Sequence, residues 1–567
     1  MHFKTLALGL FLIAPSLLLA VFVGPPSSSA GVVERQIEKE GESKEIETDK
    51  EIPLLEIEIP KQQLDLGGNR SIHVDGIAFE GNTIFSQSDL QKLIDTCIHC
   101  NVSMTEIGKI CLKIQQKYVD AGYFLARVFP PEQEVSAGIL KIRIMEGVLG
   151  NISIVGNRHY KQSFIKKYFR NLKNKPINYN QFIRSLLLLN EHQDLDVAAV
   201  FKKGELPGTA DLVLRVADKR PIHLYADVNN YGSRITSLYR AGSRFDYGNT
   251  LFQGDMLSLA GVVGMPVKDL RFADAIYRVP LNSIGTHMEL SYLYSDFRVN
   301  AMKALHLHGR SGVGTLKVDH ALLRTKPLNL DVYGSFQYVI SKNLSFQSTI
   351  SNDKLPIAGV GSRLDYLDSC QGRNLFETTL YVGIPHFLGG LKAIDPRCSR
   401  VGAGSRFVFL ELDYKRLQKL PADCFLLFNF SGQGTTYKLP LAEQIFIGGI
   451  DTVRGFPLAI GLGDNGYYTN LEARVPIPWG KNARVPGVKK KWKEFFQIVG
   501  FVDHGGVFLN GGGEDQKHSI ILTSGGVGAR IYGPYRFDVS FDAGFPLSQD
   551  QRGPNCIYYF KVNWRVF

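Results

Sequence analysis

The stretch YRFDVSFDAGF, residues 535–545, decides the fold of this chain. Every second residue is apolar, from Tyr535 to Phe545, and the residues between them are charged, polar or glycine. Successive side chains of a β-strand point to opposite faces of its sheet. The alternation therefore predicts a strand of about ten residues with one apolar face and one charged face.

The same two-residue period runs from Ile222 to the end of the chain, and no convincing helix interrupts it. Residues 222–229 and 408–415 alternate as clearly as the opening stretch. Soluble β-sandwiches also alternate, but residues 222–567 are 346 residues, which is very long for a sandwich. A membrane barrel needs strands of about 9–11 residues, and about 21 residues per strand and connection give about sixteen strands. We therefore predict a membrane β-barrel of about 16 antiparallel strands at residues 222–567, closed so that no sheet edge faces lipid.

The preceding part of the chain carries an internal repeat. Residues 71–146 and residues 147–218 each follow the order β-α-α-β-β by their apolar spacing. In each unit a glycine-asparagine pair ends the first strand, at Gly81-Asn82 and at Gly156-Asn157. Two such units about 75 residues apart predict two consecutive α+β domains.

The N-terminal residues favour export. Lys4 precedes an apolar run from Leu6 to Val23, and the small residues 28–30 follow it. This order predicts a signal peptide at residues 1–30, with a membrane anchor as the alternative. Residues 31–70 are rich in Glu and Lys and predict a charged flexible linker. Residues 34–51 are charged on every side, so they lack the apolar stripe of a packed helix.

A glycine-rich stretch, GGIDTVRGFPLAIGLGDNGYYTNLE at residues 448–472, interrupts the strand pattern. Counting strands backward from the C-terminus places it in a loop at about residues 437–468, between the eleventh and twelfth strands. Its glycines (Gly448, Gly449, Gly463 and Gly466) permit tight turns and close approach to another surface. Its single arginine, Arg454, suggests one fixed ionic contact. Loops of this length are usually functional or disordered.

A second short motif, FVDHG at residues 501–505, lies on the predicted thirteenth strand. Phe501, Asp503 and Gly505 share one face of that strand, and the apolar Val502 takes the other. Asp503 is therefore predicted to point into the barrel lumen.

These two motifs resemble the signatures of two-partner secretion transporters, the FhaC/ShlB/HecB haemolysin secretion/activation family. In that family a VRG(Y/F) motif lies on a loop folded back into the barrel, and an F-x-D-x-G motif lies on the barrel wall. The two α+β units, above all residues 121–147, similarly resemble POTRA domains (polypeptide-transport modules). The resemblance implies that Val453, Arg454, Gly455 and Phe456 meet Phe501, Asp503 and Gly505 and lock the loop to the barrel.

The same resemblance implies a function. The barrel would lie in the bacterial outer membrane, inserted by the barrel assembly machinery, and its POTRA domains would lie in the periplasm. The POTRA domains would capture one large unfolded exported protein, and the barrel would conduct it to the cell surface. A BamA-type factor that inserts other barrels is one alternative. A passive porin or surface adhesin is another, disfavoured because those proteins lack paired POTRA modules.

Other classes of protein find no support in the sequence. Residues 461–466 match the pattern G-x-G-x-x-G. A strand pattern follows them, whereas a dinucleotide site needs a helix there. No catalytic or metal-ligand spacing is present, so we predict no enzyme, no cofactor and no bound metal. The net charge of +11 is spread along the chain, apart from Lys489-Lys490-Lys491, and does not predict nucleic-acid binding. Among the seven cysteines, Cys97 and Cys100 could form a local disulfide in an oxidising compartment.

Overall fold

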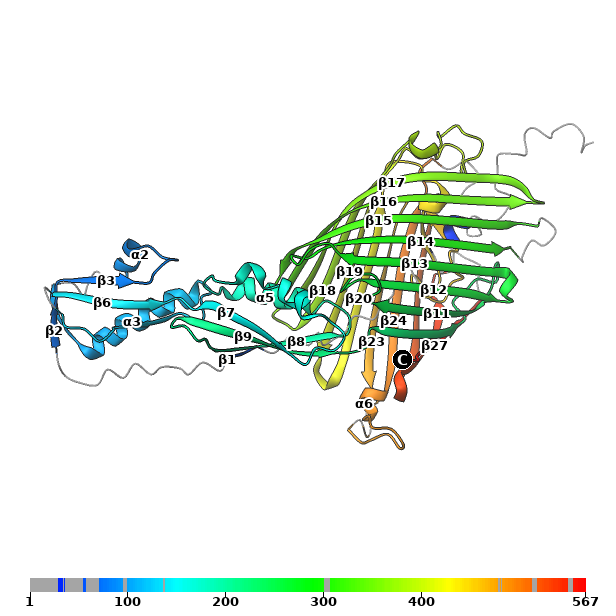
Figure 1. The fold of residues 1–567 in the computed structure, drawn as a ribbon. Coiled ribbons are helices and arrows are strands. Elements are labelled where there is room, and N and C mark those ends of the chain that lie inside the picture. The colour runs from blue at the N-terminus through cyan, green and yellow to red at the C-terminus, as the bar shows by residue number, and fades with distance from the viewer. Residues whose placement is uncertain are drawn as a thin grey trace, which may run out of the picture.

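A computed structural model describes residues 29–33, 35, 55–57, 71–94, 99–135, 138–299, 306–477, 480, 482–511, 518–548 and 554–567. Two small α+β units extend from one end of a barrel, and Figure 1 shows them in blue and cyan beside the green-to-red barrel. We call the barrel end that meets these units the near end and the opposite end the far end.

The first α+β unit packs two helices on a three-stranded sheet. The sheet has the order β3-β6-β5, and an antiparallel pair of short strands, β2 and β4, lies beside it. Its elements are β2 (Ser71–Val74), β3 (Gly76–Glu80), α2 (Gln87–Gln91), β4 (Cys100–Ser103), α3 (Met104–Asp120), β5 (Arg127–Phe129) and β6 (Ile139–Met145). Ser86 caps α2 by accepting a hydrogen bond from the Asp89 backbone N–H. Ile107, Ile110, Ile114 and Tyr118 of α3 are buried, as their helical spacing indicates.

The second unit repeats this plan. Its sheet has the order β1-β8-β9-β7, with the elements β7 (Val148–Val155), α4 (Gln162–Lys167), η4 (Arg170–Leu172), α5 (Tyr179–Leu189), β8 (Leu195–Lys203) and β9 (Thr209–Asp218). Gly81 and Gly156 have φ of 88° and 96°. A Cβ at either position would lie 2.4 or 2.3 Å from a carbonyl oxygen of the last strand of its own unit. The glycine of the repeated pair is thus required twice for the same steric reason.

Strand β1 (Leu55–Ile57) corrects the linker prediction. The sequence predicts a flexible segment here, but these three residues pair in parallel with β8 along Ala199–Phe201. Leu55 packs on the core of the second unit, and Glu56 forms an ion pair with Arg215 at 3.1 Å. An open sheet edge offers backbone hydrogen bonds to any extended segment, and composition alone does not reveal that partner.

The barrel closes through sixteen antiparallel strands, which confirms the predicted fold class. The strands are β10 (Ile222–Asn229), β11 (Tyr239–Gly248), β12 (Met256–Met265), β13 (Leu270–Pro280), β14 (Thr286–Arg298), β15 (His308–Arg324), β16 (Leu328–Ser345), β17 (Ser348–Leu367), β18 (Gly372–Gly383), β19 (Val408–Leu420), β20 (Cys424–Gly434), β23 (Asn465–Pro476), β24 (Phe496–Phe508), β25 (Ser519–Tyr532), β26 (Phe537–Pro546) and β27 (Ile557–Arg565).

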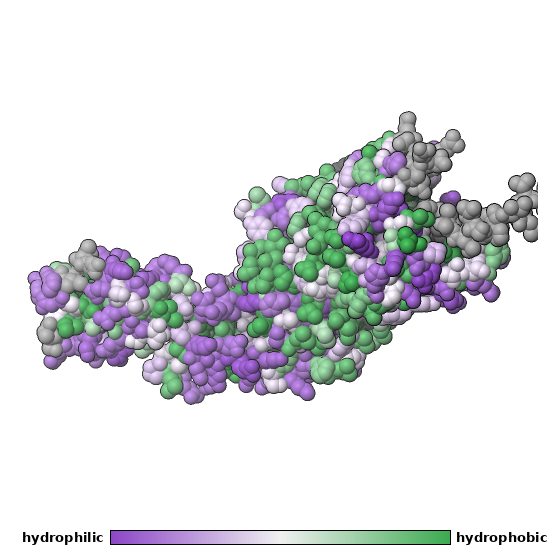
Figure 2. Space-filling model, turned by 90° about the horizontal axis from the view of Figure 1, so that it is seen from above, coloured by the Kyte–Doolittle hydropathy of each residue, from purple (hydrophilic) through white to green (hydrophobic). Residues whose placement is uncertain are grey.

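The opening stretch has the predicted two faces. Phe537, Phe541 and Phe545 are 42–44% exposed on the outer surface, whereas Asp542 between them is 3% exposed in the interior. Figure 2 shows apolar residues gathered over the barrel and hydrophilic residues over much of the α+β units. None of the helices among the described residues is long and apolar enough to span a membrane.

The second unit is fastened to the near end of the barrel. The Arg184 guanidinium on α5 donates hydrogen bonds to the carbonyl oxygens of Leu322 and Ile284, at 2.9 and 3.0 Å, and to that of Ala321. Arg324 at the end of β15 forms an ion pair with Glu191 of the second unit. These bonds join backbone and charged groups across the junction and hold the second unit against the near end of the barrel.

An aromatic contact completes this junction. Gly254, in the turn between β11 and β12, has φ of 84° and lies against the rings of Phe164 and His192. The His192 ring also contacts Tyr168, with 2.6 Å between Nε2 and the hydroxyl. Burial lowers the pKa of His192 to about 4, so this imidazole packs as a neutral ring at pH 7.

Replacing Gly254 with alanine is expected to loosen the second unit from the barrel. The new Cβ would lie 2.6 Å from Phe164 and 2.8 Å from His192, and the left-handed backbone adds strain. Distances between spin labels on β9 and β12 should broaden in the variant. Gly314→Ala is the control, since a Cβ there meets nothing within 4 Å. An unchanged distance distribution in Gly254→Ala would contradict this account of the junction.

Candidate functional site

The loop between β20 and β23 folds back into the barrel. It contains two short paired strands, β21 (Ile445–Ile447) and β22 (Gly461–Gly463). Ile445, Ile447, Val453 and Phe456 are buried, and they pack on barrel residues that include Tyr468, Val507 and Leu522. The loop therefore fills part of the lumen, in the position that the sequence resemblance implied.

The turn of the loop presents Arg454 to Asp503 on β24. Two guanidinium nitrogens, Nε and Nη2, donate to the two carboxylate oxygens of Asp503 at 2.8 and 2.9 Å. The Arg454 backbone N–H donates to the same carboxylate at 3.0 Å. Asp503 is fully buried and Arg454 is 5% exposed. This two-pronged, charge-assisted contact fixes the orientation of the arginine as well as its distance.

Each residue of the F-x-D-x-G motif has a separate role around the loop. The Phe501 ring lies under the guanidinium of Arg454, with 3.4 Å from Cζ to the ring centroid. Asp503 accepts the hydrogen bonds described above. A Cβ on Gly505 would lie 3.1 Å from the Val453 side chain and 2.9 Å from a backbone oxygen, so glycine leaves room for the loop. The motif thus presents a cation–π surface, an acceptor and a gap on one strand face.

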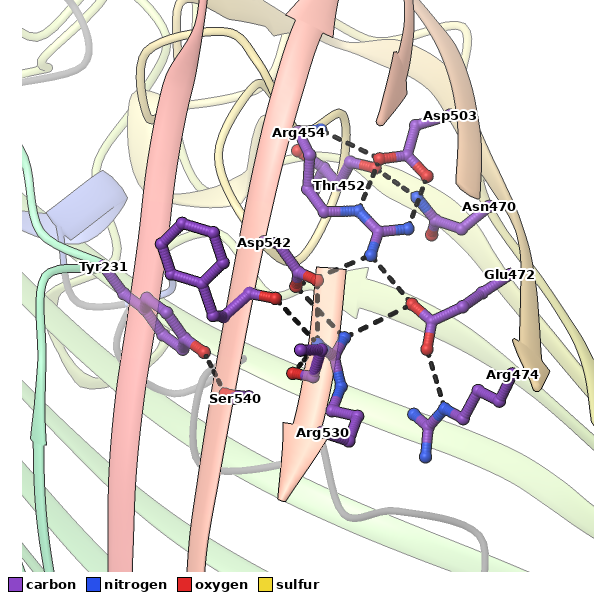
Figure 3. A network of polar contacts seen from close by, with 12 residues as sticks. Tyr231, Thr452, Arg454, Asn470, Glu472, Arg474, Asp503, Arg530, Ser540 and Asp542 are labelled. Carbon is purple, nitrogen blue, oxygen red and sulfur yellow. Dashed lines mark hydrogen bonds and ion pairs between the residues drawn. The ribbon is translucent and has the colours of Figure 1, made fainter. Parts of the chain in front are cut away.

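Arg454 is also part of a larger charged network, which Figure 3 shows from close by. Its Nη1 donates to Glu472 on β23 at 2.8 Å, and Glu472 also accepts a hydrogen bond from Arg474 at 2.8 Å. Arg530 on β25 pairs with Asp542 on β26 at 2.7 and 3.1 Å. Arginines and carboxylates alternate through the cluster. We call these six residues (Arg454, Glu472, Arg474, Asp503, Arg530 and Asp542) the lumen network.

Only Arg454 and Asp503 of this network were singled out from the sequence. Glu472 and Asp542 occupy inward positions by strand parity, but parity alone marks many polar residues along these strands. The cross-strand register decides which of them meet. The register aligns Asn470 of β23 with Asp503 of β24, and Gly528 of β25 with Asp542 of β26.

The loop approaches the barrel wall so closely that two backbones touch. Gly455 has φ of 86°, and its Cα faces Gly544 of β26. A Cβ on Gly544 would lie 2.5 Å from the Gly455 nitrogen. Tyr559 of β27 accepts a hydrogen bond from the Gly455 N–H at 3.1 Å and donates one to the Phe456 carbonyl oxygen at 3.2 Å. Phe456 is fully buried beside them.

The other predicted loop glycines shape the path to and from this turn. Gly448 and Gly449 have φ of 100° and 103°, which turns the chain after β21. A Cβ on Gly463 would lie 2.6 Å from the Phe508 nitrogen, and one on Gly466 would lie 2.8 Å from Ile445. These two glycines let the returning chain pass close to β24 and β21. A strand, β23, follows them, which agrees with the rejection of a nucleotide loop.

A second polar centre holds the far end of the loop. Asp464 is fully buried and accepts hydrogen bonds from the backbone N–H groups of Leu439 and Asn510, at 2.8 and 2.7 Å. It also forms an ion pair with Arg400 at 2.5 Å, from the connection between β18 and β19. Three far-end connections therefore meet at one carboxylate.

An N-terminal segment shares the lumen, which corrects the predicted boundaries at residues 30–33 and 35. Ala30 and Gly31 lay in the predicted signal peptide and linker, but their N–H groups donate to Asn343 Oδ1 and Ser341 Oγ, both at 3.0 Å. Arg35 forms an ion pair with Glu411 at 2.6 Å. Small residues permit this close packing. The prediction from sequence missed the segment because it expected a packed helix to carry a long apolar stripe. Residues 1–28, with the rest of the predicted signal peptide, lie outside the described residues.

The structure describes only one member of the predicted cysteine pair, Cys100. Cys100 is partly buried at the start of β4. Cys97 lies outside the described residues, so the disulfide stays a prediction. Across the described ranges, no group of three His, Cys, Asp or Glu side chains is arranged to hold a metal ion.

Comparisons with known proteins agree with this architecture. Residues 208–531 match the family model described as haemolysin secretion/activation protein ShlB/FhaC/HecB. Residues 72–147 match the model of the ShlB-type POTRA domain.

Several relatives are similar over most of their length. The outer membrane transporter CdiB of Escherichia coli is 22% identical over 532 residues, 87% of this chain and 82% of that protein. The heme/hemopexin transporter protein HuxB of Haemophilus influenzae is 22% identical over 405 residues, 69% of each chain. The hemolysin transporter protein ShlB of Serratia marcescens is 24% identical over 405 residues, 70% of each chain.

Solved structures share the fold. CdiB from Escherichia coli superposes with a TM-score of 0.74 at 18% identity, covering 95% of this chain and 99% of that one. BamA from Haemophilus ducreyi, lacking POTRA domains 1–3, reaches a TM-score of 0.50 at 14% identity, covering 87% and 100%.

Proposed function

Because this chain belongs to the ShlB/FhaC/HecB haemolysin secretion/activation family, we propose that the lumen network is the closing contact of a protein-secretion pore. The family consists of outer-membrane transporters that secrete partner proteins, and this chain is one of them. The near end of the barrel, with its α+β units, faces the periplasm. The far end faces the cell exterior.

The observation that carries this proposal is the buried two-pronged contact between Arg454 and Asp503. It holds the loop across the lumen, beside an N-terminal segment that also occupies the interior. An exported chain cannot share this space with both, so the loop or the N-terminal segment moves during transport. Buried ion pairs suit such a contact because they specify a position more than they add net stability.

The two α+β units capture the exported protein in this proposal. The edge strands β3 and β5 of the first unit each have one side without a strand partner among the described residues. An extended segment can add to such an edge through main-chain hydrogen bonds, which demand little of its sequence. The firm junction of the second unit with the barrel then delivers the captured chain to the lumen.

Two other functions receive less support. A BamA-type factor shares the fold, but its similarity is lower and the family match is to secretion transporters. A passive porin needs an open lumen, whereas here the loop and the N-terminal segment fill part of it.

For its own insertion the barrel uses the cell's barrel assembly machinery in this proposal.

Deleting the transporter is expected to stop secretion of its exported partner. The partner is sought as a large exported protein encoded beside this chain, tagged and co-expressed with it. With the full chain present the tag should appear in the medium or on the cell surface, and without it the tag should stay in the periplasm. In planar bilayers the purified chain should show a mostly closed pore with brief openings. Secretion that continues without the chain would overturn the proposed function.

A further inference from the structure

One near-end turn of the barrel is much longer than the others. Residues 477–495 connect β23 to β24 with nineteen residues, whereas three connect β15 to β16 and four connect β17 to β18. Periplasmic turns of outer-membrane barrels are ordinarily short. The secretion mechanism proposed above assigns no role to this long turn.

The turn folds into a small structure of its own, which we call the basic hairpin (residues 482–495). Arg484 and Lys491 pair across an antiparallel bridge, and Trp492 N–H donates to the Ala483 carbonyl oxygen at 3.1 Å. Gly487, with φ of 75°, allows the reversal. The short helix α6 (Trp492–Phe495) then leads into β24.

Two lysines anchor the basic hairpin to the barrel rim. Lys490 Nζ donates to the carbonyl oxygens of Tyr532 and Gly533, at 3.0 and 3.2 Å, where β25 ends. Lys493 forms an ion pair with Asp423, in the turn between β19 and β20, at 3.2 Å. The hairpin is therefore held against the ends of neighbouring strands.

The three other cations of the hairpin form no ion pair among the described residues. Residues 482–495 contain five Lys or Arg and a single carboxylate, Glu494. Arg484, Lys489 and Lys491 are exposed, and among the described residues none of their charged side-chain nitrogens pairs with a carboxylate; Glu494 accepts a hydrogen bond from the backbone N–H of Lys491, at 3.4 Å. The bridge also sets Arg484 directly opposite Lys491, and like charges opposite each other are destabilising. A bound anion would remove that repulsion.

The position of the hairpin indicates which anion is nearest. Val475 and Ile498 are register partners at the flanking strand ends, and both are over 40% exposed on the lipid-facing surface. The turn begins two residues after Val475, so it emerges at the edge of the membrane. Trp492 and Phe495 contact each other edge to face with ring centroids 5.7 Å apart, and such aromatic residues favour the membrane interface. In Figure 1 the hairpin, which includes α6, projects beyond the end of β23.

We propose that the basic hairpin binds the headgroups of anionic phospholipids in the periplasmic leaflet of the membrane. Exposed Arg484, Lys489 and Lys491 supply the positive charge, and Trp492 and Phe495 lie at the depth of the interface. Clusters of basic residues beside a membrane span are typical of anionic-lipid binding. An acidic segment of the exported protein is the competing partner, and the test below separates the two.

The test compares two full-length triple variants by native mass spectrometry in detergent. The first is Arg484→Gln/Lys489→Gln/Lys491→Gln. The matched control, Lys166→Gln/Lys167→Gln/Lys173→Gln, removes the same charge from exposed positions of the second α+β unit. Wild type and control should retain cardiolipin about tenfold better than phosphatidylethanolamine, and the hairpin variant should lose most of that preference. The preference should also fall as salt rises.

Folding is checked separately, through the slower gel migration of the heat-unfolded barrel and the level of protein in the outer membrane. Equal cardiolipin retention by the hairpin variant and wild type would overturn the proposal. So would a hairpin variant that keeps its cardiolipin preference but loses partner secretion, since the hairpin would then serve the exported chain. Loss of cardiolipin preference in both triple variants would also overturn it, because nonspecific charge would suffice.

Discussion

Replacing Arg454 with alanine is expected to abolish secretion of the partner while the barrel still reaches the outer membrane. The substitution leaves the fully buried Asp503 without the two guanidinium donors that now satisfy it. Breaking a buried ion pair from one side costs about 3–5 kcal/mol, because the remaining charge is buried and unpaired. That energy is lost from the seated position of the loop. Secretion of a tagged partner and the conductance of the purified pore measure the result.

Controls separate the loop contact from a general effect of losing a luminal arginine. Arg363→Ala removes an arginine that pairs with Glu377 at 2.9 Å on another part of the wall, and secretion should stay near normal. Arg454→Lys keeps the charge but not the two-pronged geometry, so it should restore secretion only in part. In Arg454→Ala/Asp503→Ala, thermal stability should partly recover, because no buried charge is left unpaired, while secretion should not. Normal secretion by Arg454→Ala would contradict the proposed role of the contact between Arg454 and Asp503.

Replacing Gly544 with alanine is expected to impair secretion as severely as losing Arg454, although no charge changes. The new Cβ would lie 2.5 Å from the Gly455 nitrogen and 2.9 Å from the Gly455 Cα. Both are backbone atoms, held by the hydrogen bond of Gly455 to Tyr559 at 3.1 Å. The loop turn must therefore lift from the wall, and the Arg454 contact is lost with it.

The readout is the reactivity of a cysteine introduced at Val453, which is now fully buried. In the Gly544→Ala background this cysteine should react readily with a maleimide added outside the cells. Gly500→Ala on β24 is the matched control, because a Cβ there meets nothing within 4 Å. An equally protected cysteine in the Gly544→Ala variant would show that the wall accommodates the methyl group, contrary to this account.

Much of the fold could be predicted because each barrel strand alternates residues that face lipid with residues that face the lumen, and this alternation is visible in the sequence. Alternation at residues 535–545 placed the phenylalanines outside and Asp542 inside, and the structure agrees. The same parity placed Asp503 in the lumen, where it is fully buried. That the loop enters the lumen came only from the family resemblance, since a glycine-rich loop with one arginine can equally lie outside a barrel.

Three features escaped prediction for a shared reason: each depends on a partner far away in the sequence. Glu472 and Arg530 join the lumen network only through the register of β23, β24 and β25. Residues 30–33 and Arg35 pack in the lumen because Ser341, Asn343 and Glu411 bind Ala30, Gly31 and Arg35 there. Residues 55–57 become a strand because the β8 edge is open to them.

The sequence by itself determined the class of the molecule: two α+β units, a barrel of sixteen strands, and the side on which each strand residue lies. These follow from local periodicity, which the chain carries residue by residue. The tertiary structure alone decided which inward charges meet, how closely the loop turn seats on Gly544, and which N-terminal residues fill the lumen. Those outcomes depend on cross-strand register and on a backbone approach so close that a Cβ added at Gly544 would lie less than 3 Å from the facing backbone. Neither quantity has a local signature in the sequence.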